Sequence, residues 1–228
     1  MKAGLFFFFF IGPYLSARSE PVNWADYNDT AMLTITRPKG HPIGNTICTA
    51  VVVSPHLVLT TAHCVSDATE VRITFDVENG ATAKQVQTAK PGTWAMHPLY
   101  DPRKSYFLYD LARIRLGKPA PLAQASIRTI PDKLEIPAGT RIKRIGVGLR
   151  NGFNSRNFTD PKFLSIQNKL TLETEDALSA SGDSGGPIYS PDLLLIGIHS
   201  TRDDRDHKEP ERGYGPYLPA YKEWIFSK

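Results

Sequence analysis

The chain has 228 residues, of which 41% are hydrophobic and 22% charged, a composition typical of a folded globular protein. This length suits one all-β unit or two small domains with a sizeable core. The net charge of +4 comes from basic residues scattered along the chain, which argues against a nucleic-acid-binding surface.

The N-terminal segment has the pattern of a secretory signal peptide. A positive charge at Lys2 precedes an apolar run over 3–11, and a Gly-Pro break leads to small residues ending at Ala17. We expect 1–17 to be removed and the protein to be secreted, to an extracellular or periplasmic location. The apolar run is too short to remain as a membrane anchor, and no later segment approaches the required length.

Short β-strands dominate the rest of the chain, because apolar and β-branched residues alternate between turns rich in Pro and Gly. Strands are expected over 31–36, 48–54, 56–62, 70–77, 110–116, 141–148, 164–172, 186–190 and 193–200. The tail 219–228 is the only helix expected, with a proline in its first turn. The Pro- and Ala-rich stretch 116–139 is interpreted as a crossover between two β-barrels, over 18–118 and 119–228.

Cys48 and Cys64 are the only cysteines. In an exported chain they are expected to form one disulfide, worth about 3 kcal/mol by the loop-entropy account. Two buried free thiols are the alternative.

Three further stretches carry residues suited to nucleophilic catalysis. "LTTAHC" over 59–64 contains a histidine, "FLYDLARIRL" over 107–116 an aspartate in an apolar setting, and "SASGDSGGPIYS" over 179–190 a serine among glycines. A serine nucleophile needs a base within hydrogen-bond reach, and that base needs a buried carboxylate to fix its tautomer. Glycines let backbone N–H groups converge on an oxyanion and let the substrate approach the main chain.

With "TAHC", "DLARIRL" and "GDSGGP" in this order, the chain resembles the chymotrypsin/trypsin-like serine protease family. The resemblance implies an all-β fold of two six-stranded antiparallel β-barrels with a short C-terminal helix. It implies a secreted serine endopeptidase that uses an acyl-enzyme intermediate, with His63 as general base and acid, Asp110 as its orienter and Ser184 as nucleophile. The oxyanion hole would be formed by the N–H groups of Gly182 and Ser184. The substrate-binding residues implied are Leu178, Ser179, Ser181, His199, Ser200, Thr201, Arg202 and Gly213.

The sequence lacks most of the disulfide cysteines that are usual in the family, and it lacks the family's activation sequence. Ile142, Ala180 and Ser190 stand where disulfide cysteines usually occur. No Ile-Val-type start precedes the domain, although in the family Asp183 usually pairs with such a freed N-terminus. We expect the product of signal-peptide removal, which begins near Arg18, to be active directly; trimming towards Val22 is the alternative.

The position that carries an aspartate in basic-specific members falls here on Leu178, with Asp176 two places away. His199 directly precedes Ser200, and a histidine with hydroxyl donors such as Ser181 can pair a carboxylate. The residue before the cleaved bond (P1) is therefore expected to be acidic or small rather than basic. A basic P1 through Asp176, and a small or apolar P1 with His199 merely packed, are the alternatives.

One broader alternative bears on function. A protease homologue without activity could use the same fold as a binding module. For the enzyme, the expected partners are protein or peptide substrates and the expected state is a monomer. We expect no cofactor and no metal, since the remaining histidines lack ligand spacing (His41, His56, His97 and His207).

Overall fold

A computed structural model describes residues 19–21, 24–75, 85–104, 107–150, 153–154, 157–175, 178–203 and 211–227. The expected signal peptide, Arg18, Asp176 and His207 lie outside these ranges.

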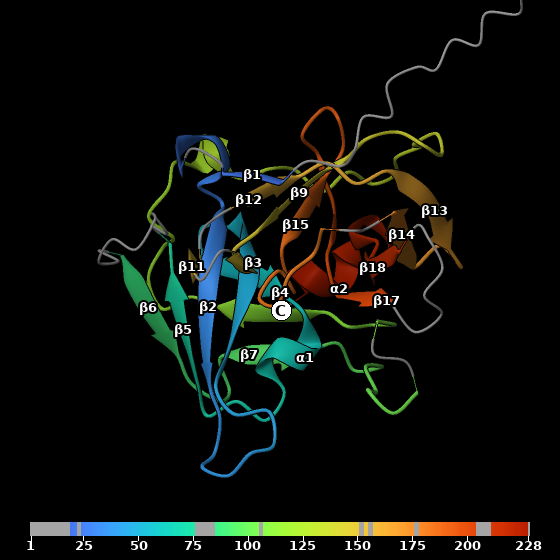
Figure 1. Cartoon of the computed structure of the whole chain (residues 1–228). Coiled ribbons are helices and arrows are strands. Elements are labelled where there is room, and N and C mark those ends of the chain that lie inside the picture. Colours follow the sequence, from blue (N-terminus) through green and yellow to red (C-terminus); the bar gives the residue numbers. More distant parts are fainter. Residues whose placement is uncertain are drawn as a thin grey trace, which may run out of the picture.

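A seven-stranded antiparallel sheet forms the first barrel, with the strand order β6-β5-β2-β3-β4-β8-β7 (Figure 1). Its strands are β2 (Thr30–Thr36), β3 (Thr46–Ser54), β4 (Leu57–Thr60), β5 (Glu70–Thr74), β6 (Val86–Ala89), β7 (Trp94–Met96) and β8 (Ala112–Arg115). In β2 the alternation predicted from the sequence places Leu33 and Ile35 fully inside.

Two further antiparallel sheets form the second barrel. One has the order β1-β12-β9-β15-β16 and the other β13-β14-β18-β17. Their strands are β1 (Ser19–Pro21), β9 (Lys143–Gly146), β12 (Asn157–Thr159), β13 (Phe163–Gln167), β14 (Thr171–Glu175), β15 (Pro187–Tyr189), β16 (Leu195–Ile198), β17 (Thr201–Asp203) and β18 (Arg212–Pro216). A two-stranded pair, β10 (Leu149–Arg150) and β11 (Phe153–Asn154), stands apart from both.

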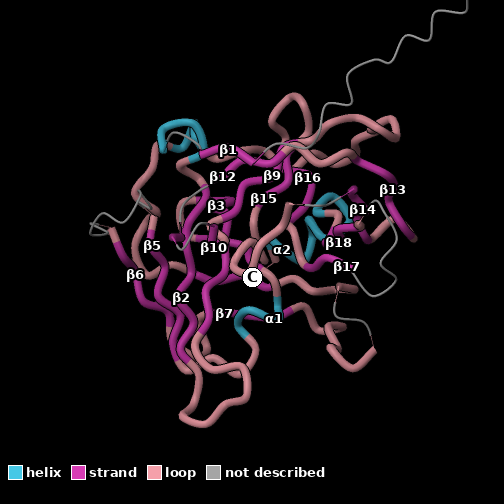
Figure 2. Tube along the Cα trace, in the orientation of Figure 1, coloured by secondary structure: helices cyan, strands magenta, loops and turns pink. Residues whose placement is uncertain are grey.

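Within the described part of the chain, helices are few and short (Figure 2). They are α1 (Ala62–Val65), α2 (Lys222–Phe226) and 3-10 turns at Trp24–Tyr27, Gln124–Ser126 and Leu218–Tyr221. None of the helices in the described ranges has the length and apolar character needed to cross a membrane. The expected all-β class, with two β-barrel domains and a short C-terminal helix, is confirmed.

Each barrel binds a segment that lies far away in the sequence. The N-terminal strand β1 pairs with β12 of the second barrel. At the other end, Arg113 on β8 of the first barrel donates from Nη1 to the carbonyl oxygens of Trp224 and Ser227 at 2.6 and 2.7 Å. The two barrels are thus joined through both termini as well as through the crossover.

Several sequence-based boundaries differ from the structure, and in two places the chain changes element within the expected strand. The strand expected over 56–62 ends at Thr60, and α1 begins at Ala62, so the tail helix is not the only one. The strand expected over 164–172 is a hairpin of β13 and β14, because Asn168 and Lys169 adopt left-handed backbone conformations and turn the chain. Among the described strands, eight were not predicted: β1, β6, β7, β10, β11, β12, β17 and β18.

One apolar cluster joins the two barrels beside the candidate site. Leu59 and Leu111 of the first barrel pack in one buried cluster with Ile145, Tyr189 and Ile198 of the second. Leu111 directly follows Asp110, so this packing fixes the chain on the C-terminal side of that carboxylate.

Candidate active site

His63 is held by the buried carboxylate of Asp110. Strand β4 leads into α1, which carries His63 at its second position. Asp110 is fully buried, and its Oδ1 accepts the backbone N–H of His63 at 2.8 Å while Oδ2 accepts from His63 Nδ1 at 2.7 Å. Ser200 Oγ donates to the same Oδ2 at 2.5 Å. Because an ionised carboxylate only accepts, Nδ1 carries the proton and Nε2 is left as the basic nitrogen.

Asp110 follows a strained residue that aromatic rings hold in place. Tyr109 has a φ of 58°, which is uncommon for a bulky residue. Its ring stacks on His97 with centroids 5.1 Å apart, and His97 also meets Tyr221 and Trp224 at 5.3 and 5.0 Å. We call these four rings the aromatic cluster. Burial lowers the pKa of His97 in it, so the cluster favours a neutral imidazole.

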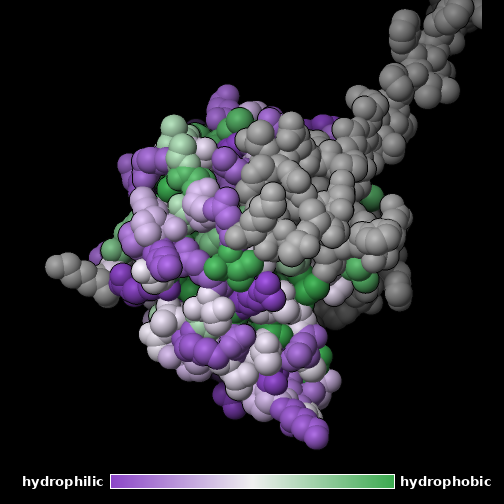
Figure 3. All heavy atoms as spheres, turned by 90° about the vertical axis from the view of Figure 1, so that its left-hand side faces the viewer, coloured by the Kyte–Doolittle hydropathy of each residue, from purple (hydrophilic) through white to green (hydrophobic). Residues whose placement is uncertain are grey.

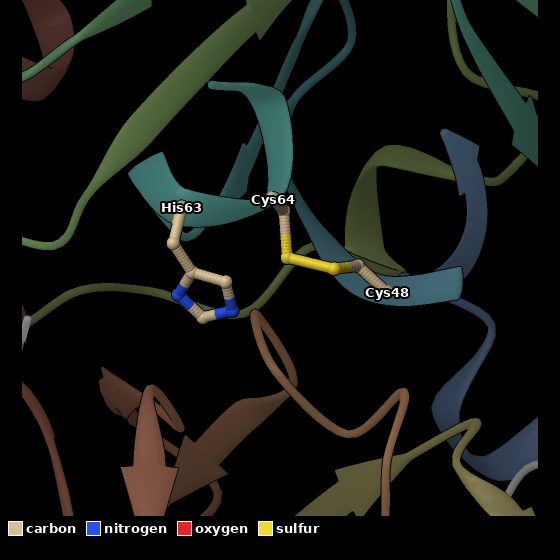
Figure 4. Close-up of side chains that lie close together, drawn as sticks. All are labelled: Cys48, His63 and Cys64. Carbon is tan, nitrogen blue, oxygen red and sulfur yellow. A yellow bond between two sulfur atoms is a disulfide. The ribbon is translucent and has the colours of Figure 1, made fainter. Parts of the chain in front are cut away.

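The predicted disulfide between Cys48 and Cys64 is confirmed, with the Cα atoms 6.3 Å apart. Figure 4 shows that it ties α1, which carries His63 and Cys64, to the strand carrying Cys48, with the imidazole beside the sulfur atoms. One donor atom from each of these residues lies within 4.8 Å of the others. Because both sulfurs are used in the disulfide, this cluster offers only the imidazole to a metal ion.

Arg37 fixes the backbone of α1. Arg37 is only 7% exposed. It donates to the carbonyl oxygens of His63, Cys64 and Ser66 at 3.3, 3.1 and 3.3 Å, at the end of α1 where a cation is favoured. Burial lowers the pKa of this guanidinium.

Ser184 lies in a tight turn that glycine permits. Gly182 and Gly185 have φ values of 103° and 85°, and a Cβ at Gly185 would lie 2.1 Å from the carbonyl oxygen of Thr49. Ser184 lines the same cavity as His63. In this conformation its Oγ donates to the carbonyl oxygen of Ser200 at 3.1 Å.

The N–H groups of Gly182 and Ser184 each share a peptide with a carbonyl that accepts a hydrogen bond. The Ser181 carbonyl accepts from the N–H of Leu149 at 2.9 Å, and the Asp183 carbonyl accepts from the N–H three residues further on, also at 2.9 Å. In a trans peptide the C=O and N–H point in opposite directions. The N–H groups of Gly182 and Ser184 are therefore directed away from these anchors, and neither has an acceptor among the hydrogen bonds of the described ranges.

The side chain of Asp183 is buried and bonded to backbone amides. Its Oδ1 accepts from the N–H of Gly148 and its Oδ2 from the N–H of Ala180, both at 2.8 Å. A Cβ at Gly146 would lie 2.0 Å from Oδ1, so a glycine leaves the space that this carboxylate fills. These contacts form in the chain as it stands, without an Ile-Val-type terminus.

The cavity at the site has a volume of about 370 Å³. It is lined by His63, Ser179, Ala180, Ser181, Ser184, His199, Ser200, Thr201 and Arg202. Among the predicted substrate-binding residues, Leu178 and Gly213 are described but do not line it; Gly213 lies on β18 opposite Arg202. His199 is 4% exposed, and Arg202 is paired with Glu211, Nη1 to Oε2, at 3.1 Å.

Comparison with known families and structures agrees with this arrangement. The family described as Trypsin matches residues 22–225. The chain belongs to the trypsin family. Three solved structures show the same fold as this trypsin-family chain: a scabies mite inactivated protease paralogue, S-I1, at 18% identity, GrC at 17% and HL collagenase at 21%.

The three alignments cover 91%, 91% and 90% of this chain and 96%, 96% and 94% of the other, with TM-scores of 0.73, 0.73 and 0.72. At these identities the likeness extends to the fold alone. The trypsin-family fold is therefore present over nearly the whole described chain, while the roles of individual side chains rest on the local geometry.

Proposed function

We propose that this protein is a secreted serine endopeptidase in which His63, Asp110 and Ser184 carry the reaction. One observation carries the proposal: a buried carboxylate fixes the His63 imidazole at 2.7 Å, in a cavity that His63 shares with Ser184. The N–H groups of Gly182 and Ser184 are the oxyanion donors.

The reaction follows from these positions. Ser184 Oγ rotates from the carbonyl of Ser200 toward His63 and attacks the substrate carbonyl carbon, while its proton passes to Nε2 of His63. The substrate oxygen becomes an oxyanion that the N–H groups of Gly182 and Ser184 stabilise, and Asp110 stabilises the imidazolium. The imidazolium then protonates the leaving amine as the C–N bond breaks, which leaves an ester on Ser184. Water repeats the sequence and releases the acid.

The lining of the cavity supports an acidic or small P1 residue. Among the described residues that line it, none carries a carboxylate that could pair with a substrate Lys or Arg. His199 and the hydroxyl groups of Ser179 and Ser181 offer donors to a carboxylate without a permanent buried charge. Arg202 is already paired with Glu211, so it contributes a weaker attraction than a free guanidinium would.

Other features support an endopeptidase that acts outside the cell as a monomer. A second cavity of about 440 Å³ shares Ser181 with the first, so a bound peptide has space on both sides of that residue. The disulfide is consistent with an oxidising compartment. Polar and apolar residues are interspersed on the described part of the face shown in Figure 3, which favours a solvated surface.

The test is covalent labelling of the purified secreted protein with a fluorophosphonate, together with hydrolysis of a mixed peptide library. Ser184→Ala and His63→Ala should each lower kcat by on the order of 10⁴-fold or more while the fold is kept, because only oxyanion and binding contributions remain. Ser126→Ala, remote from the cavity, is the matched control and should keep wild-type activity.

A binding module without catalysis is the second candidate, since a structural neighbour is described as an inactivated protease paralogue and Ser184 Oγ here bonds to Ser200. Wild-type protein that is neither labelled nor able to cleave any peptide would establish it.

Matched peptides with Glu, Ala, Phe or Arg at P1 test specificity. Wild type should prefer Glu or Ala, and His199→Val should reduce cleavage after Glu most. Best cleavage after Arg would refute the P1 assignment and point to Asp176.

A further inference from the structure

The hydroxyl group of Thr49 joins the first barrel to the loop that carries Gly182 and Ser184. Thr49 lies on β3 beside Cys48 and is fully buried. Its Oγ1 donates to the carbonyl oxygen of Gly182 at 2.7 Å and accepts from the N–H of Val147 at 3.1 Å. The hydroxyl therefore contacts two segments of the second barrel at once.

The backbone of Thr49 contacts the same loop. Its N–H donates to the carbonyl oxygen of Ser184 at 2.8 Å. Its own carbonyl oxygen is fixed by Thr60 Oγ1 at 2.8 Å. Thr49 thus holds the carbonyls of both residues whose N–H groups serve as the proposed oxyanion donors, and every polar atom of Thr49 is used.

We propose that Thr49 is a positioning residue that sets the geometry of the oxyanion loop from the opposite barrel; this rests on the proposed function. The Gly182 carbonyl is held on one side, and the Asp183 N–H that shares its peptide donates to Ala180 on the other, at 3.0 Å. The Gly182–Asp183 peptide is therefore fixed at both polar groups. Because the Ser181 carbonyl is also held, by the N–H of Leu149, the peptides on both sides of Gly182 are anchored, and with them its φ of 103°.

Removing only the hydroxyl isolates this contribution. Thr49→Val keeps the shape of the side chain but leaves the Gly182 carbonyl and the Val147 N–H buried without this partner. The loop then satisfies these groups by rotating its peptides, which displaces the oxyanion donors. Loss of one such donor typically lowers kcat 10²–10³-fold, so displacement of the loop should lower kcat by about 10–100-fold.

The experiment compares Thr49→Val, Thr49→Ser and the control Thr174→Val on one peptide substrate. Thr174 is also a buried threonine, and its hydroxyl donates to a backbone carbonyl on β18 at 3.4 Å, away from the oxyanion loop. We expect the kcat loss in Thr49→Val with a change in KM of no more than about threefold, recovery to within about fivefold of wild type in Thr49→Ser, and near-normal kcat in Thr174→Val.

Thr49→Val with wild-type kcat and a native fold would overturn the proposal, as would Thr49→Ser that is as slow as Thr49→Val. If Thr49→Val does not fold, Thr49→Ala decides, because it also removes the hydroxyl: a normal kcat there also refutes the role.

If the proposed function is wrong, the wild-type protein itself will neither cleave peptides nor react with the fluorophosphonate, which distinguishes that outcome from a failure of the Thr49 proposal. In that case amide hydrogen exchange still reports on the contact, since Thr49→Val should accelerate exchange at Val147. Unchanged exchange would refute it.

Discussion

We expect the buried ion pair between Asp29 and Arg128 to contribute to the stability of the fold, because it joins the segment before β2 to the crossover. Asp29 is fully buried, and its Oδ1 accepts from Arg128 Nη1 at 2.7 Å. Its Oδ2 accepts from the hydroxyl of Tyr189 at 3.0 Å, and burial raises the pKa of that tyrosine, so it stays a donor. The guanidinium lies over the rings of Tyr27 and Tyr189, 4.8 Å from each centroid.

Asp29→Asn keeps the shape and an acceptor but removes the charge that Arg128 faces. Breaking a buried pair from one side costs about 3–5 kcal/mol. Arg128 keeps 16% side-chain exposure, a hydrogen bond to the Asp26 carbonyl and its aromatic contacts, so we expect about 3 kcal/mol, the lower end of that range. For a chain of this size, that corresponds to a fall in Tm of roughly 6–12 °C.

The assay is thermal unfolding in a Ser184→Ala background, which prevents self-digestion. The matched control is Glu135→Gln, because Lys133 and Glu135 are also 2.7 Å apart but are 79% and 83% exposed. The control should leave the midpoint unchanged. Arg128→Met combined with Asp29→Asn should cost less than the sum of the single changes. Equal midpoints for Asp29→Asn and Glu135→Gln would refute the reasoning.

Three further predictions concern the site and its supports. Replacing both Cys48 and Cys64 by Ala should cost about 3 kcal/mol of unfolding free energy in urea titrations, from a 16-residue separation; an unchanged midpoint would contradict it. Gly185→Ala should give little folded, labelled protein, since its Cβ would lie 2.1 Å from the Thr49 carbonyl oxygen; normal labelling would show that the turn adapts. Because burial lowers the pKa of His97, the unfolded chain binds its proton first, so stability should fall as the pH drops below about 6.5. His97→Gln should flatten this fall between about pH 7 and 5, and an unaltered slope in midpoint-against-pH curves would refute the assignment.

The sequence was sufficient to predict features that depend on local pattern or on a specific motif. The alternation in β2 predicted its buried face, and the two cysteines of an expected secreted chain predicted the disulfide. The motifs around His63, Asp110 and Ser184 indicated residues that lie together in the fold. His63 and Ser184 line one cavity, and Asp110 is hydrogen-bonded to His63. Their catalytic roles stay predictions.

Contacts that depend on the third dimension could not be predicted in this way. Arg37 stands in "TRPKG", which is typical of an exposed turn, yet its side chain folds back under α1. Thr49 looks like one more β-branched strand residue, and only the packing of two barrels brings its hydroxyl to Gly182. Tyr109 gives no local signal for a left-handed backbone, because tertiary stacking on His97 holds it there.

The contacts that link each barrel to a distant segment of the chain affect when the fold can be completed during synthesis. Arg113 is translated more than a hundred residues before Trp224 and Ser227, whose carbonyl oxygens it binds. The N-terminal strand β1 likewise waits for β12, which follows it by more than a hundred residues. Contacts between residues so far apart in the sequence form slowly, so these two links between the barrels are expected late in folding.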